Sequence, residues 1–276
     1  MALLGVDPVL MFLQIRSFAI ITSAVILNPL VIAISPLSSS AETFQVYKDD
    51  KLTGGRAIIG TGQNLPALSS SGVWAIGNFP KEEIEKYHNK QSAADQQSVA
   101  DAAIAWTNQW SQSRCNVPKS LDFSQCRLAA VFDVDDTMLS SYFVDLNSPV
   151  PFVHNGKLLN NAIESCKTPV IEPVRKAYQA FRSWGIATFI VTGRSKNQRK
   201  STLNCLESMG MSEWEGAHFK PHEYKGSASQ WKYQVRQLLI NDGWNIGPSI
   251  GDQVSVMFYG SFTRGFLMPN VRYFIK

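Results

Sequence analysis

Short apolar runs alternate with helical spacings along most of this chain. The run RLAAVFDV is short and mostly apolar, which is typical of a buried strand. Similar runs follow it, and segments of helical periodicity separate those up to residue 252. The expected strands are RLAAVFDV (127–134), IATFIV (186–191), AHFK (217–220), NIGPSIGD (245–252) and two short segments around GFLMPN and RYFIK.

The segments between these runs predict helices. Apolar residues spaced by four, three and four positions share one face of the first helix: Val99, Ala103, Trp106 and Trp110. Residues 111–126 are expected to connect this helix to the first strand. Further helices are expected over residues 171–181, over 195–209 with Gly210 closing it, and around Trp231, Val235 and Leu238.

Strands that alternate with helices predict a parallel sheet covered by helices on both faces. The expected fold is therefore α/β and Rossmann-like, with a helical extension before the first strand and a small cap or none. Residues 142–170 have no clear period and predict a loop or small insertion over a site. Ligands bind at the carboxyl ends of such strands, where Asp133, Thr192 and Asp252 are expected to meet.

The N-terminal part of the chain has a different character. Residues 17–41 carry no charge, follow Arg16 and end in small residues, which is typical of a secretory signal. Cleavage after Ala41 is the favoured interpretation, and retention as a membrane anchor is the alternative. A secreted or periplasmic location follows from cleavage. The expected parts are a signal peptide or anchor at 1–41, a loosely structured arm at 42–80 and an α/β domain at 81–276.

The cysteine count fits an exported chain. Four cysteines, Cys115, Cys126, Cys166 and Cys205, permit two disulfides in three possible pairings. Cys115 and Cys126 are near in sequence and form the easiest local pair, whereas buried free thiols are the alternative. No CxxC motif or Cys/His cluster occurs, so a zinc site is not expected.

The charge balance argues against one class of partner. The chain has 26 basic and 22 acidic side chains, a formal net charge of +4 and no basic run. Nucleic acid is therefore not an expected partner. With 45% hydrophobic residues in a chain of 276, a sizeable core is expected.

Three carboxylates, Asp133, Asp135 and Asp136, follow the first expected strand directly. Like charges this close repel each other and resist burial, so a compensating partner is expected. An EF-hand loop starting at Asp133 is excluded, because its sixth and twelfth positions hold Met138 and Val144. A GxxxxGK[ST] nucleotide loop is also absent from the sequence. A magnesium-dependent phosphoryl-transfer site explains the acids best, because the cation offsets their repulsion. A solvated acidic turn is the alternative.

Four segments together resemble the motifs of the haloacid dehalogenase superfamily. In chain order they are DVDDT (133–137), IVTGR (190–194), EYKG (223–226) and SIGDQ (249–253). The chain looks most like the exported acid phosphatases of this superfamily, which are related to plant acid phosphatases and vegetative storage proteins. The resemblance covers residues 80–276 and implies that the α/β domain is a phosphatase domain.

The resemblance implies a magnesium site. Asp133 is the implied nucleophile and a metal ligand, and Asp135 is the implied general acid/base with its backbone carbonyl on the metal. Asp252 is the remaining implied ligand. Few carboxylates together with water suit Mg²⁺.

The resemblance also implies groups that hold the phosphate. Thr192 would donate a hydrogen bond to a phosphoryl oxygen, with help from the amide of Gly193, and Lys225 would neutralise phosphate and aspartyl charge. Family members usually follow this lysine with Ser and Arg, whereas KGSASQ stands here. Lys220 and Lys232 are therefore competitors for its role.

The fourth motif departs from the family pattern. Its usual second acid comes four or five residues after the first, where this chain has Val256 and Met257. Such an acid often orients a metal-bound water, and its loss weakens metal affinity or activity by roughly 10- to 100-fold. Reduced metal affinity with an intact nucleophile is expected. Glu223 or a backbone group is a candidate substitute.

The sequence favours a magnesium-dependent acid phosphatase that hydrolyses small phosphomonoesters outside the cytoplasm through an aspartyl-phosphate. A storage or binding protein of the same fold with little catalysis is one alternative, and the missing acid favours it. A phosphotransferase that uses the same residues is another. No stable membrane association is expected if residues 1–41 are cleaved, whereas their retention would favour an anchored protein.

Overall fold

The structure is a computed structural model that describes residues 45–47, 54–64, 80–116 and 122–275. The expected signal peptide or anchor at 1–41 lies outside the described residues and stays a prediction. Across the described ranges, no helix has both the length and the apolar character needed to cross a bilayer.

Within the described residues, seven strands form one sheet in the order β1-β2-β7-β6-β3-β4-β5. β1 is antiparallel to β2, and the other neighbouring strands are parallel. The expected Rossmann-like arrangement is confirmed, including the strand that contains Gly247 and Pro248. The strands are β1 (Gln45–Tyr47), β2 (Ile58–Gly60), β3 (Leu128–Phe132), β4 (Ala187–Ser195), β5 (Gly216–Lys220), β6 (Asn245–Gly251) and β7 (Arg264–Leu267).

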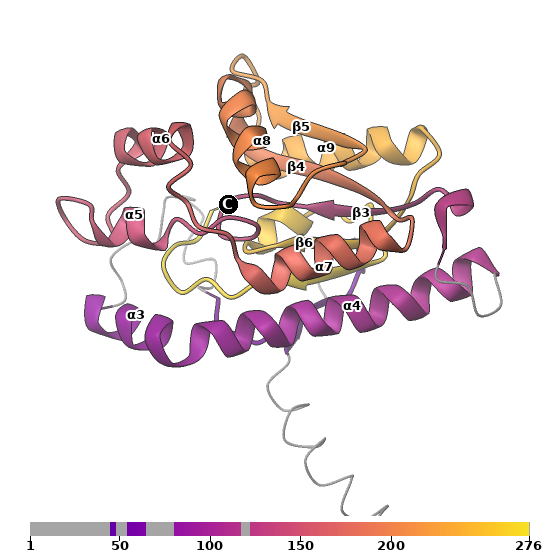
Figure 1. Ribbon diagram of the computed structural model, residues 1–276, viewed down its shortest axis with the longest axis horizontal. Helices are drawn as coiled ribbons and strands as arrows, with labels where there is room; N and C mark the ends of the chain where they lie inside the picture. Colours follow the sequence, from indigo (N-terminus) through magenta and orange to yellow (C-terminus); the bar gives the residue numbers. More distant parts are fainter. Residues whose placement is uncertain (1–44, 48–53, 65–79, 117–121, 276) are drawn as a thin grey trace, which may run out of the picture. The chain divides into compact units, whose positions relative to one another are not determined.

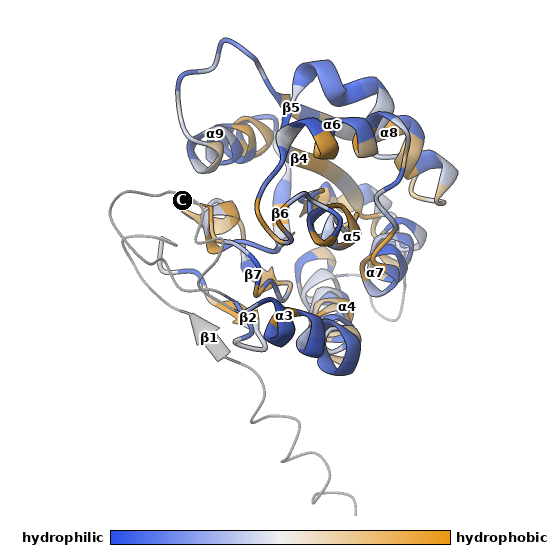
Figure 2. Cartoon of the chain, turned by 90° about the vertical axis from the view of Figure 1, so that its left-hand side faces the viewer, coloured by the Kyte–Doolittle hydropathy of each residue, from blue (hydrophilic) through white to orange (hydrophobic). Residues whose placement is uncertain are grey.

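Helices cover both faces of the sheet (Figure 1). α4 and α7 pack against each other and against β6, β7 and β4, while α9 packs on β4, β5 and β6. Figure 2 shows α9 polar on its outer side and hydrophobic toward β4. The helices are α3 (Lys81–Tyr87), α4 (Ala93–Cys115), α5 (Tyr142–Leu146), α6 (Gly156–Glu164), α7 (Glu172–Ser183), α8 (Arg199–Ser208) and α9 (Ala228–Asn241).

Successive residues of β3 serve the two faces in turn, as the pleat of a strand requires. Val131 belongs to the apolar cluster that contains Val235 of α9. Its neighbour Phe132 contacts α7, with ring centroids 5.5 Å from Tyr178 and 5.9 Å from Phe181. Because both faces are buried, the strand is apolar throughout until the acids begin.

Several element boundaries differ from the sequence expectation. Helix α4 runs to Cys115 instead of ending near residue 110, because the left-handed turn that stops it comes at Asn116, with φ 49°. Residues 272–275 of the segment RYFIK form no strand, and the backbone there bonds to a side chain instead: the N–H of Ile275 donates to Gln253 Oε1.

The arm expected at residues 42–80 contains β1 and β2. β2 lies parallel to β7, with Ile59 opposite Phe266, so this part of the arm is an edge of the sheet. Residues 48–53 and 65–79 lie outside the described residues.

Two disulfides tie the elements together. Cys115 pairs with Cys126, which confirms the local pair, and their Cα atoms are 5.6 Å apart. This bond joins the end of α4 to the turn before β3. Cys166 pairs with Cys205 of α8 at a Cα separation of 5.4 Å, so the segment after α6 is covalently held to the core.

Candidate active site

The carboxyl ends of β3, β4 and β6 meet at a cavity of about 260 Å³. Asp133 and Asp135 follow β3, Gly193 lies near the end of β4, and Asp252 follows β6, and all of them line this cavity. Parallel strands bring these distant segments to one edge, as the sequence predicts. Helix α9 contributes Lys232 to the same cavity.

Asp133 is buried and forms an ion pair with a buried lysine. Its Oδ2 accepts a hydrogen bond from Lys232 Nζ at 2.7 Å, and its Oδ1 accepts one from the N–H of Val134 at 2.8 Å. Burial raises the pKa of Asp133 above its usual range, although the Lys232 ammonium acts to lower it. The carboxylate therefore depends on cationic neighbours to stay ionised.

The structure places Lys232, and not Lys225, at the cavity. Lys225 is exposed in the turn before α9, which begins with a capping box at Ser227. Lys232 lies one helical turn before Val235 and faces the core with it. This periodicity is the signal in the sequence that favours Lys232, since a lysine on an apolar face needs a buried partner.

Asp135 is held by an arginine that the sequence reasoning did not select. Arg194 Nε and Nη2 both donate to Asp135 Oδ1, at 3.0 and 2.7 Å, and Nε also lies 3.2 Å from Oδ2. Arg194 is itself buried, and its Nη1 donates to Thr202 Oγ1 of α8 at 2.9 Å. A fork of this kind fixes both the position and the rotation of a carboxylate. In the sequence, Arg194 is the last residue of the IVTGR motif, and this position is the signal that points to it.

Thr192 and Gly193 occupy the end of β4 as expected. Thr192 is fully buried, and its Oγ1 accepts a hydrogen bond from the N–H of Arg194 at 3.1 Å. Gly193 lines the cavity, whereas Thr192, the residue before it in the sequence, does not. The threonine therefore shapes the turn that presents Gly193 and Arg194.

Asp252 is buried and receives hydrogen bonds from two amides. Its Oδ2 lies 2.7 Å from both Gln253 Nε2 and Asn270 Nδ2. Burial, with the charges of Asp133 and Asp136, raises the pKa of Asp252 to about 7. This end of the cavity is therefore short of positive charge.

The donors at the cavity fit a magnesium ion. Within the described residues, no three His, Cys, Asp or Glu side chains gather as a metal cluster. Mg²⁺ does not require one, because it commonly uses one or two carboxylates with waters and substrate oxygens. Asp133 and Asp252 both line the cavity and, with the backbone carbonyl that the resemblance implies for Asp135, would make such a set.

The positions of the missing second acid face the core. Val256 and Met257 are buried in the apolar cluster between α9 and the sheet. Glu223, a candidate substitute, is exposed. The groups that contact the carboxylate of Asp252 are instead Gln253 and Asn270.

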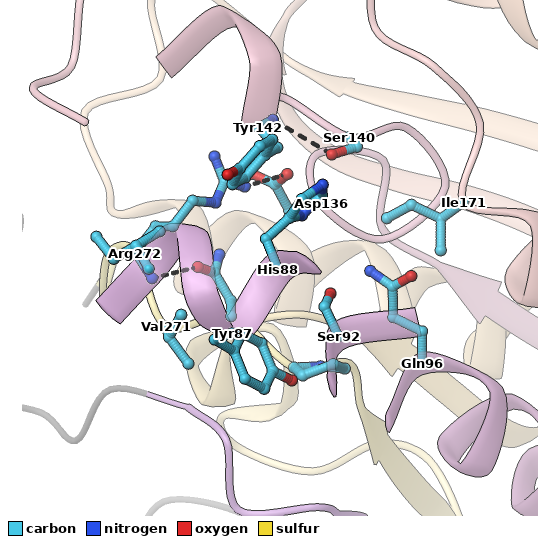
Figure 3. Close-up of a pocket in the computed structure, with 13 residues that line it drawn as sticks. Tyr87, His88, Ser92, Gln96, Asp136, Ser140, Tyr142, Ile171, Val271 and Arg272 are labelled. Carbon is cyan, nitrogen blue, oxygen red and sulfur yellow. Dashed lines mark hydrogen bonds and ion pairs between the residues drawn. The ribbon is translucent and has the colours of Figure 1, made fainter. Parts of the chain in front are cut away.

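The third acid of the run, Asp136, does not line this cavity but a second pocket, where Figure 3 shows it beside Arg272. Its carboxylate pairs with Arg272 and accepts hydrogen bonds from Tyr273 and Ser141. Burial acts to raise the pKa of Asp136, but these partners lower it overall. Arg272 also pairs with Asp145 of α5. Asp136 is thus compensated by a cation without facing the cavity.

The insertion at residues 142–170 contains α5 and α6 and supplies one wall of the cavity. His154, Leu159 and Ile163 line this wall. A hydrogen bond of 2.7 Å from Gln198 Nε2 to Asn160 Oδ1 and the Cys166–Cys205 disulfide hold it in place. The expectation of a small insertion over the site is confirmed.

This chain belongs to the HAD superfamily, subfamily IIIB (acid phosphatase), whose family profile matches residues 72–276. Relatives include acid phosphatase 1 of Solanum lycopersicum, 29% identical over 52% of this chain and 58% of that protein. Vegetative storage protein 1 of Arabidopsis thaliana is 28% identical over 52% of this chain and 54% of that protein. The chain thus matches little more than half the length of these two relatives.

Two further comparisons cover more of the chain. The stem 28 kDa glycoprotein of Glycine max is 24% identical over 76% of this chain and 82% of that protein. The crystal structure of a class C acid phosphatase from Bacillus anthracis with tungstate bound superposes with a TM-score of 0.51. That match has 16% identity and covers 70% of this chain and 85% of the other, and it supports the fold.

Proposed function

We propose that this protein is a magnesium-dependent acid phosphatase that hydrolyses small phosphomonoesters through an aspartyl-phosphate on Asp133. The observation that carries this proposal is the convergence of Asp133, Asp135 and Lys232 on one cavity. Membership of the acid phosphatase subfamily supports the same reaction class.

In the first step a carboxylate oxygen of Asp133 attacks phosphorus, and the bond from phosphorus to the ester oxygen breaks. Asp135, which lines the same cavity, gives its proton to the departing oxygen and so releases an alcohol. The Arg194 fork holds the Asp135 carboxyl on the cavity side of the loop.

In the second step water attacks the phosphorus of the aspartyl-phosphate, and the bond to the Asp133 oxygen breaks. Asp135 takes the proton of that water, which restores both carboxyl groups and releases inorganic phosphate. If an acceptor alcohol replaces water, the same residues perform phosphotransfer, so acceptor competition separates the two reactions.

Cationic and backbone groups stabilise the charge on the transferring phosphoryl group. Lys232, paired with Asp133, takes the role that the sequence assigned to Lys225, and Arg194 adds a second cation at the cavity wall. The N–H of Gly193, which lines the cavity, is the proposed neutral donor, and the buried Thr192 shapes the turn that presents it. Asp133, Asp252 and the backbone carbonyl of Asp135 would hold a magnesium ion, which would supply further charge neutralisation.

Hydrolysis of a chromogenic aryl phosphate tests the proposal. The chain without residues 1–41 is assayed from pH 4 to pH 8 with Mg²⁺ and with a chelator, beside Asp133→Asn. Turnover that needs Mg²⁺ and is lost in the variant is the expected result. Turnover that persists in Asp133→Asn would overturn the assignment of the nucleophile.

A storage protein with little catalysis is the second candidate. The burial of Val256 and Met257 where an acid usually stands favours it, and one relative is named a vegetative storage protein. Absence of turnover at every pH and Mg²⁺ concentration, in a folded chain, would select this candidate.

The proposed location is outside the cytoplasm. The two disulfides support an oxidising compartment, because such bonds persist there and are rare in the cytosol. Expression with residues 1–41 fused to a periplasmic reporter tests export. Retention of that segment in the mature chain would favour an anchored form instead.

A further inference from the structure

Asp252 is compensated differently from the other acids of the site. Asp133 and Asp135 each contact a cationic side chain. Within the described residues, the carboxylate of Asp252 is bonded only by the amides of Gln253 and Asn270, both at Oδ2. Within the same part of the chain no hydrogen bond reaches its other oxygen, Oδ1, and the residue lines the cavity.

The main chain of residues 270–275 decides which way both amides point. The N–H of Arg272 donates to Asn270 Oδ1 at 2.9 Å, and the N–H of Ile275 donates to Gln253 Oε1 at 2.9 Å. An amide whose oxygen is already occupied by a donor presents its NH₂ group on the opposite side. Both NH₂ groups are therefore aimed at Oδ2 of Asp252.

The start of this segment is anchored to the residues that follow β2. The N–H of Asn270 donates to the carbonyl of Gln63 at 2.9 Å, and Asn64 Nδ2 donates to the carbonyls of Asp252 and Met268 at 3.0 and 2.9 Å. Hydrogen bonds thus connect residues 268–270, Asp252 and the residues that follow β2.

The residue at the family's second-acid position, Val256, cannot orient the carboxylate of Asp252 in this chain. Val256 packs on the backbone of β6, and a Cβ added at Gly251 would lie 2.8 Å from Val256 Cγ1. Arg236 of α9 fixes the loop, because its guanidinium donates to the carbonyls of Val256, Phe258 and Gly260. The side chain at position 256 is therefore held in the core.

We propose that Asn270 and Gln253 are positioning residues for divalent-cation binding. They hold Oδ2 of Asp252 so that Oδ1 faces the cation, and residues 270–275 set their orientation. This inference rests on the proposed function, because it concerns the same metal. It explains how an acid at the end of β6 stays oriented without a charged partner.

Titration calorimetry of the folded chain with MgCl₂ tests the proposal. Asn270→Leu and Gln253→Met keep the size of the side chain but remove the donor. Each is expected to raise the Kd for Mg²⁺ by about 10- to 100-fold. Gln237→Ala is the matched control, because it removes an amide hydrogen bond, to Ser261, outside the cavity.

A second readout separates positioning from folding. Thermal unfolding with chelator present identifies the variants that fold. Because two positions are tested, the proposal can still be judged if one of the two variants does not fold. For a folded variant, saturating Mg²⁺ is expected to restore kcat with aryl phosphate. A purely structural role would lower the melting temperature and leave the Kd for Mg²⁺ unchanged.

The outcomes distinguish this inference from the proposed function. An unchanged Kd in both folded variants overturns the inference alone. Mg²⁺ binding that depends on the amides in a chain without turnover supports the inference and overturns the phosphatase proposal. If the wild-type chain hydrolyses aryl phosphate but binds no Mg²⁺, the inference and the metal requirement are both wrong. The proposal that the chain is a phosphatase is then retained.

Discussion

The loop after β3 and the loop after β6 place acids at the same edge of the sheet, but they compensate them in opposite ways. After β3, Asp133, Asp135 and Asp136 pair with Lys232, Arg194 and Arg272 respectively. After β6, the donors to the Asp252 carboxylate within the described residues are two amides, and burial with the charges of Asp133 and Asp136 raises its pKa to about 7. Each acid of the β3 loop thus has a cationic side chain as partner, whereas the acid of the β6 loop is held by neutral amides.

The largest expected effect comes from the nucleophile. Asp133→Asn removes the attacking oxygen and is expected to lower kcat by on the order of 10⁴- to 10⁶-fold. Asp252→Asn keeps the nucleophile, so high Mg²⁺ should partly restore the kcat that this variant loses. Stopped assays with aryl phosphate over a range of Mg²⁺ concentrations measure kcat for both variants. If both lose the same amount of kcat and Mg²⁺ restores neither, the two loops do not differ in the way described.

The β3 side depends on Lys232. Lys232→Met removes a cation from a buried carboxylate and from the transferring phosphate, so kcat/KM should fall by about 10²- to 10³-fold. Breaking the buried pair also costs about 3–5 kcal/mol of unfolding free energy. Lys225→Met is the control, because Lys225 is exposed. If Lys225→Met has the larger effect on kcat/KM, the assignment of Lys232 is wrong.

Restoring an acid to the β6 side at position 256 should fail. Val256→Asp places a carboxylate in an apolar core, which costs about 3–5 kcal/mol when the charge is uncompensated. Urea unfolding is expected to show this loss without tighter Mg²⁺ binding. A stable Val256→Asp chain with a lower Kd for Mg²⁺ would show that the loop can turn toward the cavity.

Arg194 provides a more moderate perturbation. Arg194→Lys keeps the charge but loses the fork that holds Asp135, so the general acid is misplaced. We expect kcat/KM to fall by about 10- to 100-fold. The fall should be larger for alkyl phosphates than for nitrophenyl phosphate, because a poor leaving group needs the proton more. Equal losses for both substrates would argue that Arg194 acts only on the phosphate.

The smallest effect concerns pH and stability. Burial raises the pKa of Asp145 to about 6, although Arg272 acts to lower it. The folded state then binds a proton more tightly than the unfolded state, so this group stabilises the fold at low pH. That contribution is lost as pH rises from about 4 to 6.

Asp145→Asn tests this titration. The variant is expected to flatten the dependence of melting temperature on pH between pH 4 and pH 6, with Glu223→Gln as an exposed control. An unchanged pH profile in Asp145→Asn would assign the dependence to another acid.

The strands and the acids at their ends could be predicted from the sequence, because apolar runs ending in Asp133 and Asp252 leave few alternatives. The motif EYKG favours Lys225, whereas the helical period of α9 places Lys232 beside Val235 and at the cavity. Asn270 and Arg272 could not be found, since their partners are distant in sequence and are brought near only by the path of the chain after β7.

A search for the covalent intermediate is the most direct test of the proposed reaction. The chain is mixed with excess phosphomonoester and Mg²⁺, quenched in acid within milliseconds, digested and analysed by mass spectrometry. A phosphoryl group on Asp133, absent from Asp133→Asn, is the predicted result. Turnover with no adduct on Asp133, or with an adduct on another residue such as His154, would contradict it.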